Sequence, residues 1–199
     1  MARRNDHTRE ELTELTLQTL DQFLTTHSYR ELSLRKLASL IGYVPSTLVN
    51  VFGSYNLLLL HGIARTLDKL SQLALTASQQ HSDNPKQALL AIAHCYHDFA
   101  KAHPNHWQLI FEHSMQGDEL PQWQSQRIET MMTLLETLLH ALSPQRSDQE
   151  VLEASRVLWS GVHGITLLSV DDKFFTSSPV NGEHLIDNLI EQYLQNWSL

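Results

Sequence analysis

The pattern of apolar and polar positions along this chain is helical from end to end. Apolar residues recur at intervals of three and four, which places them on one face of an α-helix, and no stretch alternates like a half-buried strand. The sequence therefore predicts an all-α fold of about nine helices. In order, the expected elements are a first helix opened by Thr8 and Glu11, a pair within 33–52, a long helix at 55–80, helices beginning at 85 and 104, one at 123–142, one from 147 to 170, a loop at 171–182 and a last helix ending at 197.

Residues 33–52, SLRKLASLIGYVPSTLVNVF, are typical of two short helices joined by a tight turn. Ser33 can cap the first helix through its hydroxyl, and Gly42 follows its apolar face, where a left-handed backbone favours glycine. Pro45 suits the first turn of the second helix, because the N–H that it lacks would be unpaired there. Such a pair can insert its second helix into the major groove of DNA, although periodicity alone fits an ordinary helical hairpin equally well.

The run 37–58 resembles the N-terminal DNA-binding domain of the TetR family of bacterial regulators. The residues that carry the resemblance are Leu37, Ala38 and Gly42, then Thr47, Leu48 and Phe52, then Ser54, Leu57 and Leu58. The resemblance implies an N-terminal three-helix bundle with a helix-turn-helix in residues 1–54. It also implies a helical effector-binding and dimerisation domain in residues 55–199. A regulator of this family, more often a repressor than an activator, binds a pseudo-palindromic operator in double-stranded DNA as a homodimer.

The resemblance places the DNA-contacting residues on the second helix of the pair and around it. They are Ser33, Arg35, Tyr43, Pro45, Ser46, Thr47, Val49, Asn50 and Tyr55. We expect Thr47 and Asn50 to read base edges, because asparagine can pair with adenine in the major groove. Tyr43, Ser46 and Tyr55 are expected at the DNA backbone.

Two departures from the family pattern weaken the expected phosphate contacts. Val49 stands where the family usually has tyrosine, and Tyr55 stands where it usually has lysine. The cationic residues that could compensate are Lys36, Arg3, Arg4 and Arg9. We therefore expect DNA binding with a shallow salt dependence, because the slope follows the number of neutralised phosphates.

The chain is acidic overall, with a formal net charge of −8 at pH 7. Residues 1–65 hold seven Lys/Arg and six Asp/Glu, whereas residues 66–199 hold seven and sixteen, so the acidity belongs to the C-terminal part. This distribution is compatible with an N-terminal DNA-binding domain and argues against polyanion binding by the remainder. One cysteine, Cys95, permits no intrachain disulfide. No signal segment or membrane-length apolar run is evident, so we expect a cytoplasmic protein without a membrane partner.

Aromatic and methionine residues on three consecutive predicted helices indicate an apolar cavity for a small, apolar effector. The candidates are Tyr96, Phe99, Trp107, Phe111, Trp123 and Met131, and a filled core is an equal alternative for each. The stretch at 158–164, LWSGVHG, resembles a Trp-His-Gly type of C-terminal domain in the family. Its Trp159 and His163 share a helical face and could line the cavity or lock the helix against its neighbours. Packing is the favoured interpretation for these two, because a buried aromatic usually serves packing.

The last two long helices are expected to pair with their two-fold mates in the dimer, as the resemblance implies. The residues assigned to this interface are Leu152, Leu158, Gly161, Ile165, Leu168, Leu185, Leu189 and Tyr193. The alternative is that they serve only the intrachain core. We favour dimerisation because a helix-turn-helix protein usually needs two half-sites about one DNA turn apart.

Twelve histidines raise the alternative of a metal site. His94, Cys95 and His97 lie together on one predicted helix, and imidazole and thiolate ligands can bind zinc or nickel. A second group follows at His103, His106, Glu112 and His113. Because the chain has no Cys-x-x-Cys or His-Glu-x-x-His motif, we expect no bound metal or other cofactor.

No phosphate loop, nucleophile elbow or paired carboxylates indicate an enzyme. Two alternatives to a ligand-responsive regulator stay open. One is an all-α metal-binding or ligand-binding protein without a DNA role. The other is a DNA-binding protein of the same fold that recruits a partner protein.

Overall fold

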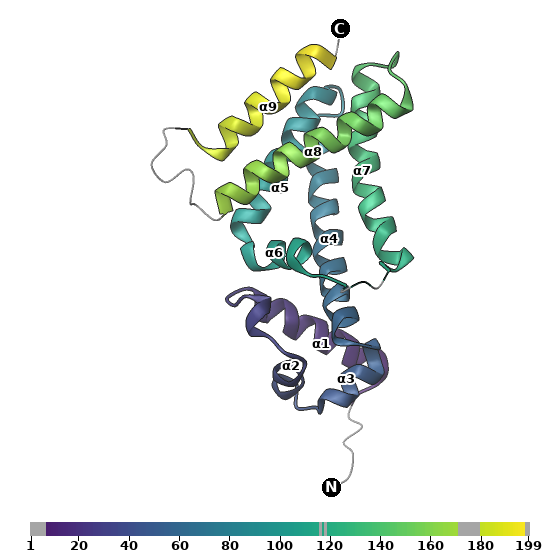
Figure 1. The fold of residues 1–199 in the computed structure, drawn as a ribbon, viewed down its shortest axis with the longest axis vertical. Helices are drawn as coiled ribbons and strands as arrows, with labels where there is room; N and C mark the ends of the chain where they lie inside the picture. Colours follow the sequence, from purple (N-terminus) through teal and green to yellow (C-terminus); the bar gives the residue numbers. More distant parts are fainter. Residues whose placement is uncertain (1–6, 116, 118, 171–179, 198–199) are drawn as a thin grey trace. The chain divides into compact units, whose positions relative to one another are not determined.

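The structure, a computed structural model, describes residues 7–115, 117, 119–170 and 180–197. These residues form nine α-helices and one short 3-10 helix and contain no β-strand, which confirms the predicted all-α class (Figure 1). Arg3, Arg4 and most of the loop expected at 171–182 lie outside the described residues.

The helices begin and end close to the positions predicted from the sequence. The elements are α1 (Arg9–Leu24), η1 (Tyr29–Glu31), α2 (Leu34–Leu40), α3 (Pro45–Phe52), α4 (Tyr55–Gln79), α5 (Pro85–Ala102), α6 (Pro104–Glu112), α7 (Gln122–Leu142), α8 (Asp148–Val170) and α9 (Gly182–Trp197). No single helix in the described ranges is long and apolar enough to cross a membrane; α3 and α4 reach that hydropathy only when taken together across a 64° bend.

The helices belong to two compact units. The first lies within Met1–Thr66 and Asn105–Pro121, and the second within Leu67–Pro104 and Gln122–Leu199. Helix α4 contributes residues to both units. A functional boundary after residue 54 therefore remains a prediction.

Capping and turn residues set the ends of the first helices. Thr8 accepts a hydrogen bond from the backbone N–H of Glu11, whose carboxylate accepts one from the N–H of Thr8. Ser33 caps α2 by accepting from the N–H of Lys36 at 3.2 Å. Gly42 adopts a φ of +76° after α2, and Pro45 occupies the first turn of α3. These four features confirm the predictions made from the sequence.

The first unit is built on α1, α2 and α3, which pack against one another. Leu37, Ala38 and Leu48 are fully buried in its core. Helix α6 joins this unit through two polar contacts: Asn105 Nδ2 donates to the Leu24 carbonyl at 3.1 Å, and His106 Nε2 lies 3.0 Å from Asp21 Oδ1. The side chain of the next residue, Trp107, is almost fully buried, in the same unit.

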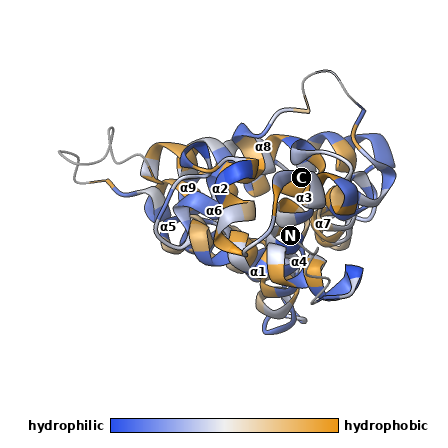
Figure 2. Cartoon of the chain, turned by 90° about the horizontal axis from the view of Figure 1, so that it is seen from below, coloured by the Kyte–Doolittle hydropathy of each residue, from blue (hydrophilic) through white to orange (hydrophobic). Residues whose placement is uncertain are grey.

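The second unit has α5 at its centre. Helix α5 packs against α7, α8 and α9, and α8 packs against both α7 and α9. Each helix carries apolar and polar positions together, as the mixed colouring of the ribbons in Figure 2 shows. The end of α9 is held against α7, because Trp197 Nε1 donates to the Leu139 carbonyl at 3.1 Å. Ser143 Oγ donates in turn to the Trp197 carbonyl at 3.0 Å.

The core position Leu37 offers a test of this packing. We expect Leu37→Ala to lower the free energy of unfolding by about 2–5 kcal/mol, because the truncation removes buried apolar surface and leaves a cavity. Leu40→Ala, on the same helix but 55% exposed, should change it by less than about 0.5 kcal/mol. Urea unfolding followed by circular dichroism measures both. Equal effects of the two substitutions would contradict the assignment of Leu37 to the core.

Candidate DNA-binding surface and effector cavity

Helix α3 turns an apolar side to the core of the first unit and a more polar side to solvent. Leu48 and Phe52 are buried, whereas Ser46, Val49 and Asn50 are exposed. Thr47 lies between the two sides and is partly exposed. The structure therefore presents Ser46, Thr47, Val49 and Asn50 from one short helix, with amide and hydroxyl groups that can hydrogen-bond to base edges.

The residues around α3 differ in how freely they can reach a ligand. Arg35 is exposed, and its guanidinium makes no hydrogen bond or ion pair with another described residue. Tyr43 is half-buried, and its hydroxyl lies 2.7 Å from His7 Nδ1. Ser33 uses its hydroxyl oxygen as the α2 cap, and Pro45 is partly buried in the first turn of α3. Of these four, Arg35 is the one that offers an uncommitted positive charge.

Tyr55 does not present its hydroxyl to solvent. The oxygen is buried and has no hydrogen-bond partner among the described residues, and burial raises the pKa of the Tyr55 phenol to about 12. A phosphate could reach this oxygen only after the side chain rotates out of the first unit. The phosphate contact expected through the Tyr55 hydroxyl is therefore at odds with the structure.

The cations expected to compensate for the missing phosphate contacts are partly engaged. Lys36 Nζ donates to the Glu31 carbonyl at 3.3 Å and lies 4.6 Å from the centroid of the Phe23 ring. Arg9 Nη2 donates to the carbonyl of Val51 at 2.9 Å, near the C-terminal end of α3. Arg9 is thus the cation that the structure fixes beside the candidate recognition helix.

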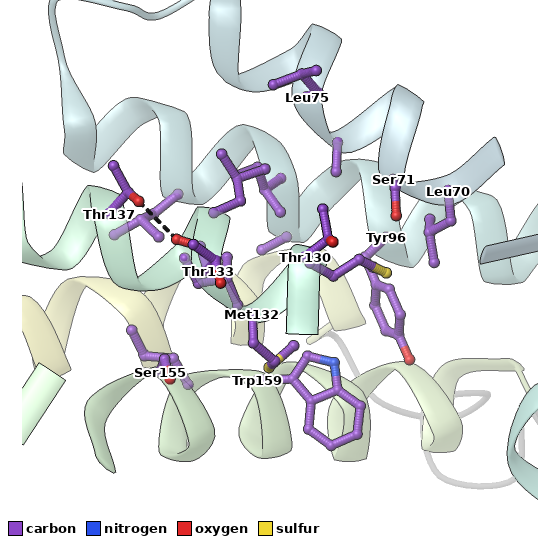
Figure 3. A pocket seen from close by; sticks show the side chains of 18 of the residues that line it. Leu70, Ser71, Leu75, Tyr96, Thr130, Met132, Thr133, Thr137, Ser155 and Trp159 are labelled. Atoms are coloured by element: carbon purple, nitrogen blue, oxygen red, sulfur yellow. Dashed lines mark hydrogen bonds between the residues drawn. The ribbon is translucent and has the colours of Figure 1, made fainter. Parts of the chain in front are cut away.

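The second unit contains a cavity of about 510 Å³, a volume typical of small-molecule sites (Figure 3). Its wall comes from α4, α5, α7 and α8, with Ile190 added from α9, and most of the lining side chains are apolar. The exposed lining residues are Asp68, Gln72 and Leu75 of α4 with Thr130, Thr133 and Thr137 of α7. The mouth of the cavity therefore lies between α4 and α7.

Three of the residues predicted for the effector cavity line it: Tyr96, Met131 and Trp159. His163 does not line the cavity but contacts two of these residues. Its Nδ1 lies 2.7 Å from the Tyr96 hydroxyl, and its ring stacks on Trp159 with centroids 5.2 Å apart. Burial lowers the pKa of His163, which favours the neutral ring. Trp159 thus lines the cavity and packs at once, and His163 links it to Tyr96.

The other four predicted residues are not part of this wall. Trp107 and Phe111 belong to the first unit, so they cannot line a cavity in the second. Phe99 is buried in the second unit beside His103, with ring centroids 4.9 Å apart. Trp123 is half-buried, and its ring lies 5.7 Å from the guanidinium carbon of Arg127. Apolar character alone did not distinguish a cavity wall from a packed core or, for the exposed Phe111, from the protein surface.

The α4 side of the wall and the α7 threonines were missed in the sequence. Asp68 and Arg127 form a bidentate ion pair there, with Nε–Oδ1 and Nη2–Oδ2 distances of 2.8 and 3.2 Å. The one signal that could have revealed the α7 side is the spacing of Thr130, Thr133 and Thr137, which places three hydroxyls on one helical face.

The residues predicted for a dimer interface differ in exposure: some are exposed, one is buried and the others are partly buried. Leu152 and Leu168 of α8 are exposed, and so are Val157 and Leu167, which were not predicted. Leu158 instead is buried and lines the cavity. The remaining members are partly buried; they are Gly161, Ile165, Leu185, Leu189 and Tyr193.

Gly161 serves the packing of α8 on α9 within the chain. A Cβ at this position would lie 2.5 Å from Leu189 Cδ2, so a larger residue would force the two helices apart. Gly164, one turn further along α8, is different, because a Cβ there would meet no atom within 4 Å. Of the two glycines, it is Gly164 that leaves room for a partner.

The histidine-rich part of α5 is engaged in other contacts. His94 Nε2 lies 2.7 Å from Asp187 Oδ1, and the buried His97 lies 3.4 Å from the Thr166 hydroxyl. Cys95 is half-buried, and burial raises the pKa of its thiol. Within the described ranges, no three His, Cys, Asp or Glu side chains are arranged to hold a metal ion.

Comparison with known proteins adds a family and a set of similar folds. The model of a tetracyclin repressor-like C-terminal domain matches residues 89–193. A search of curated proteins gives no significant match. A protein of unknown function from Rhodococcus sp. RHA1 is similar over 100% of both chains, with 16% identity and a TM-score of 0.79.

Two further solved structures are similar to this chain and carry functional names. The TetR family transcriptional regulator PfmR from Thermus thermophilus has 17% identity and a TM-score of 0.61, over 90% of this chain and 97% of its own. AibR, solved with isovaleryl coenzyme A and operator DNA, has 16% identity and a TM-score of 0.63, over 93% and 97%. At such low identity, these similarities establish a shared fold.

The buried hydroxyl of Tyr55 leads to a prediction. We expect Tyr55→Phe to leave DNA affinity unchanged and to raise the free energy of unfolding by up to about 1 kcal/mol, because it removes a buried oxygen that lacks a partner. Fluorescence anisotropy with labelled duplex DNA and urea unfolding measure the two quantities. A loss of affinity in Tyr55→Phe would instead restore the phosphate contact.

Proposed function

Because the chain belongs to the tetracyclin repressor-like (TetR) family, whose model matches more than half of its residues, we propose that it represses transcription by binding a pseudo-palindromic operator as a dimer and responds to a small effector. The observation that carries the proposal is the exposed polar side of α3, which follows a tight turn and a capped helix. This is the arrangement that enters a major groove. We place this activity in the bacterial cytoplasm, where operator DNA is found.

In this proposal, α3 reads the operator. Asn50 and Thr47 contact base edges, and Ser46 and the uncommitted guanidinium of Arg35 contact phosphates. Arg9, bonded to the end of α3, adds a positive charge beside it. With few free cations, positioning on DNA depends more on hydroxyl and backbone N–H donors than in a lysine-rich protein.

The effector acts through the cavity of the second unit. Helix α4 supports this role because its N-terminal residues belong to the DNA-binding unit and its Asp68, Ser71 and Leu75 line the cavity. A ligand that contacts these residues therefore contacts a helix that also contributes to the DNA-binding unit. It changes operator affinity only if it binds the DNA-bound and the free arrangements with different affinities.

The dimer is supported by the outward face of α8. Val157, Leu167 and Leu168 are exposed there, and Gly164 faces open space between them. An apolar helical face with a small residue at its centre suits close packing against a second helix. We propose that this face, with the half-buried residues of α9, pairs two subunits.

Operator recognition is tested first on Asn50. We expect Asn50→Ala to weaken binding to the operator by about fivefold to a hundredfold, equivalent to about 1–3 kcal/mol, and to leave binding to random DNA unchanged. Anisotropy with DNA from upstream of the protein's own gene, or with fragments selected from genomic DNA, measures both. Asn188→Ala, at an exposed asparagine of α9, is the matched control.

Each result has a clear consequence. Unchanged specificity of Asn50→Ala would remove this residue from base readout. Equal weak binding of the unmodified protein to upstream, genomic and random DNA would contradict a DNA-binding function and favour an all-α ligand-binding protein.

The two glycines of α8 test the dimer. We expect Gly164→Leu to raise the dimer dissociation constant by about tenfold to a hundredfold, because the side chain enters the space of the partner, while helical content is retained. Gly161→Leu, which overlaps Leu189 within the chain, should lower the thermal unfolding midpoint instead. Analytical ultracentrifugation and circular dichroism distinguish these effects. A dimer of Gly164→Leu with unaltered affinity would place the interface elsewhere.

A further inference from the structure

The cavity wall offers no unpaired charge to a ligand. Among the described residues that line it, the charged ones are Asp68 and Arg127, which pair with each other. The remaining terminal nitrogen of Arg127, Nη1, donates to the Trp123 carbonyl at 2.6 Å, so the guanidinium is held on both sides by the protein. An anionic group drawn inside the cavity would have to break this ion pair or remain unpaired against apolar side chains, which carries a large desolvation cost.

The hydroxyls of the α7 side are oriented by their own helix. Thr130 donates to the Gln126 carbonyl at 2.9 Å, and Thr133 donates to the Glu129 carbonyl at 2.9 Å. Thr137 donates to the Thr133 carbonyl at 2.8 Å, which is the dashed contact in Figure 3. Because each hydroxyl hydrogen is already bonded within the helix, the oxygen can still accept a hydrogen bond from a ligand.

The rest of the wall complements an apolar body. Tyr96 and Trp159 line the cavity with the threonines (Figure 3), and leucine, isoleucine and methionine side chains make up most of the remaining lining. Ser155 of α8 differs from the threonines, because its hydroxyl donates to the Leu152 carbonyl at 2.8 Å and its oxygen already accepts from Arg156 Nη1 at 3.0 Å. A molecule that fits this wall buries apolar surface on one side and donates a hydrogen bond on the other.

We propose that the effector is an uncharged, largely apolar molecule that donates a hydrogen bond from a hydroxyl group, such as an aliphatic alcohol or a phenol. Its hydroxyl donates one hydrogen bond to the oxygen of Thr130, Thr133 or Thr137, and its apolar body lies against α5 and α8. This inference rests on the proposed function only in treating the cavity as the effector site. The cavity's preference for such molecules is a separate property of the protein.

The preference can be measured with four probes that share a ten-carbon chain. They are 1-decanol, decyl methyl ether, decanoate and decylammonium, titrated into the full-length protein without DNA by calorimetry. We expect 1-decanol to bind about threefold to tenfold more tightly than the ether, the gain of one hydrogen bond. It should bind at least about tenfold more tightly than either ion.

The threonines provide the matched variants. In the triple substitution Thr130→Val, Thr133→Val, Thr137→Val, the shape of the wall is kept and the acceptors are lost. We expect 1-decanol to fall to the affinity of the ether while the affinity of the ether itself is unchanged, which shows that the fold is intact. Thr76→Val is the control, because Thr76 makes the same type of bond, to the Gln72 carbonyl at 2.8 Å, and does not line the cavity.

The outcomes separate this inference from the proposed function. Tighter binding of decanoate or decylammonium, absence of binding by 1-decanol, or an unchanged alcohol preference in the triple variant would each overturn the inference. DNA binding, measured separately by anisotropy, would be untouched by any of these. Conversely, an alcohol preference that depends on the threonines would stand even if the protein failed to select any DNA sequence.

Discussion

One uninterrupted helix, α4, is the constraint on which the rest of the structure depends. It runs from Tyr55 to Gln79, about 37 Å at the usual rise per residue. Leu58, Ile63 and Leu70 are buried along it, so packing supports the helix over its length. Because α4 belongs to both compact units, residues that line the cavity and residues that follow the candidate recognition helix α3 lie on the same helix.

Charge is used sparingly at both candidate sites. In the DNA-binding unit, Lys36 and Arg9 are bonded to backbone carbonyls, and Arg35 makes no bond to another described residue. In the cavity, Asp68 and Arg127 neutralise each other. Apart from Arg35, the uncommitted groups that the two candidate sites offer are therefore neutral: hydroxyls, an amide and apolar surface. Such groups discriminate by geometry, because a buried polar atom left without a partner costs free energy.

Local signals explain why much of the fold was predictable. The caps at Thr8 and Ser33, the positive φ of Gly42 and the position of Pro45 each depend on neighbours within a few residues. Periodic apolar residues likewise report which face of a helix is buried. The helical pair at 33–52 and the helix order could therefore be derived before any coordinates were known, whereas the family rested on the resemblance of residues 37–58.

The sequence by itself determined the all-α class and the helix ends, because these follow from short-range backbone and capping preferences. Only the tertiary structure decided which aromatic residues meet. Trp107 is separated from Tyr96 by eleven positions in the chain, yet it packs in the other unit. Tertiary packing likewise decided that the Tyr55 hydroxyl is buried and that Leu158 lines the cavity. These placements depend on contacts between helices that are distant in sequence. In the sequence alone, an apolar residue that lines a cavity cannot be distinguished from one that packs against a neighbouring helix.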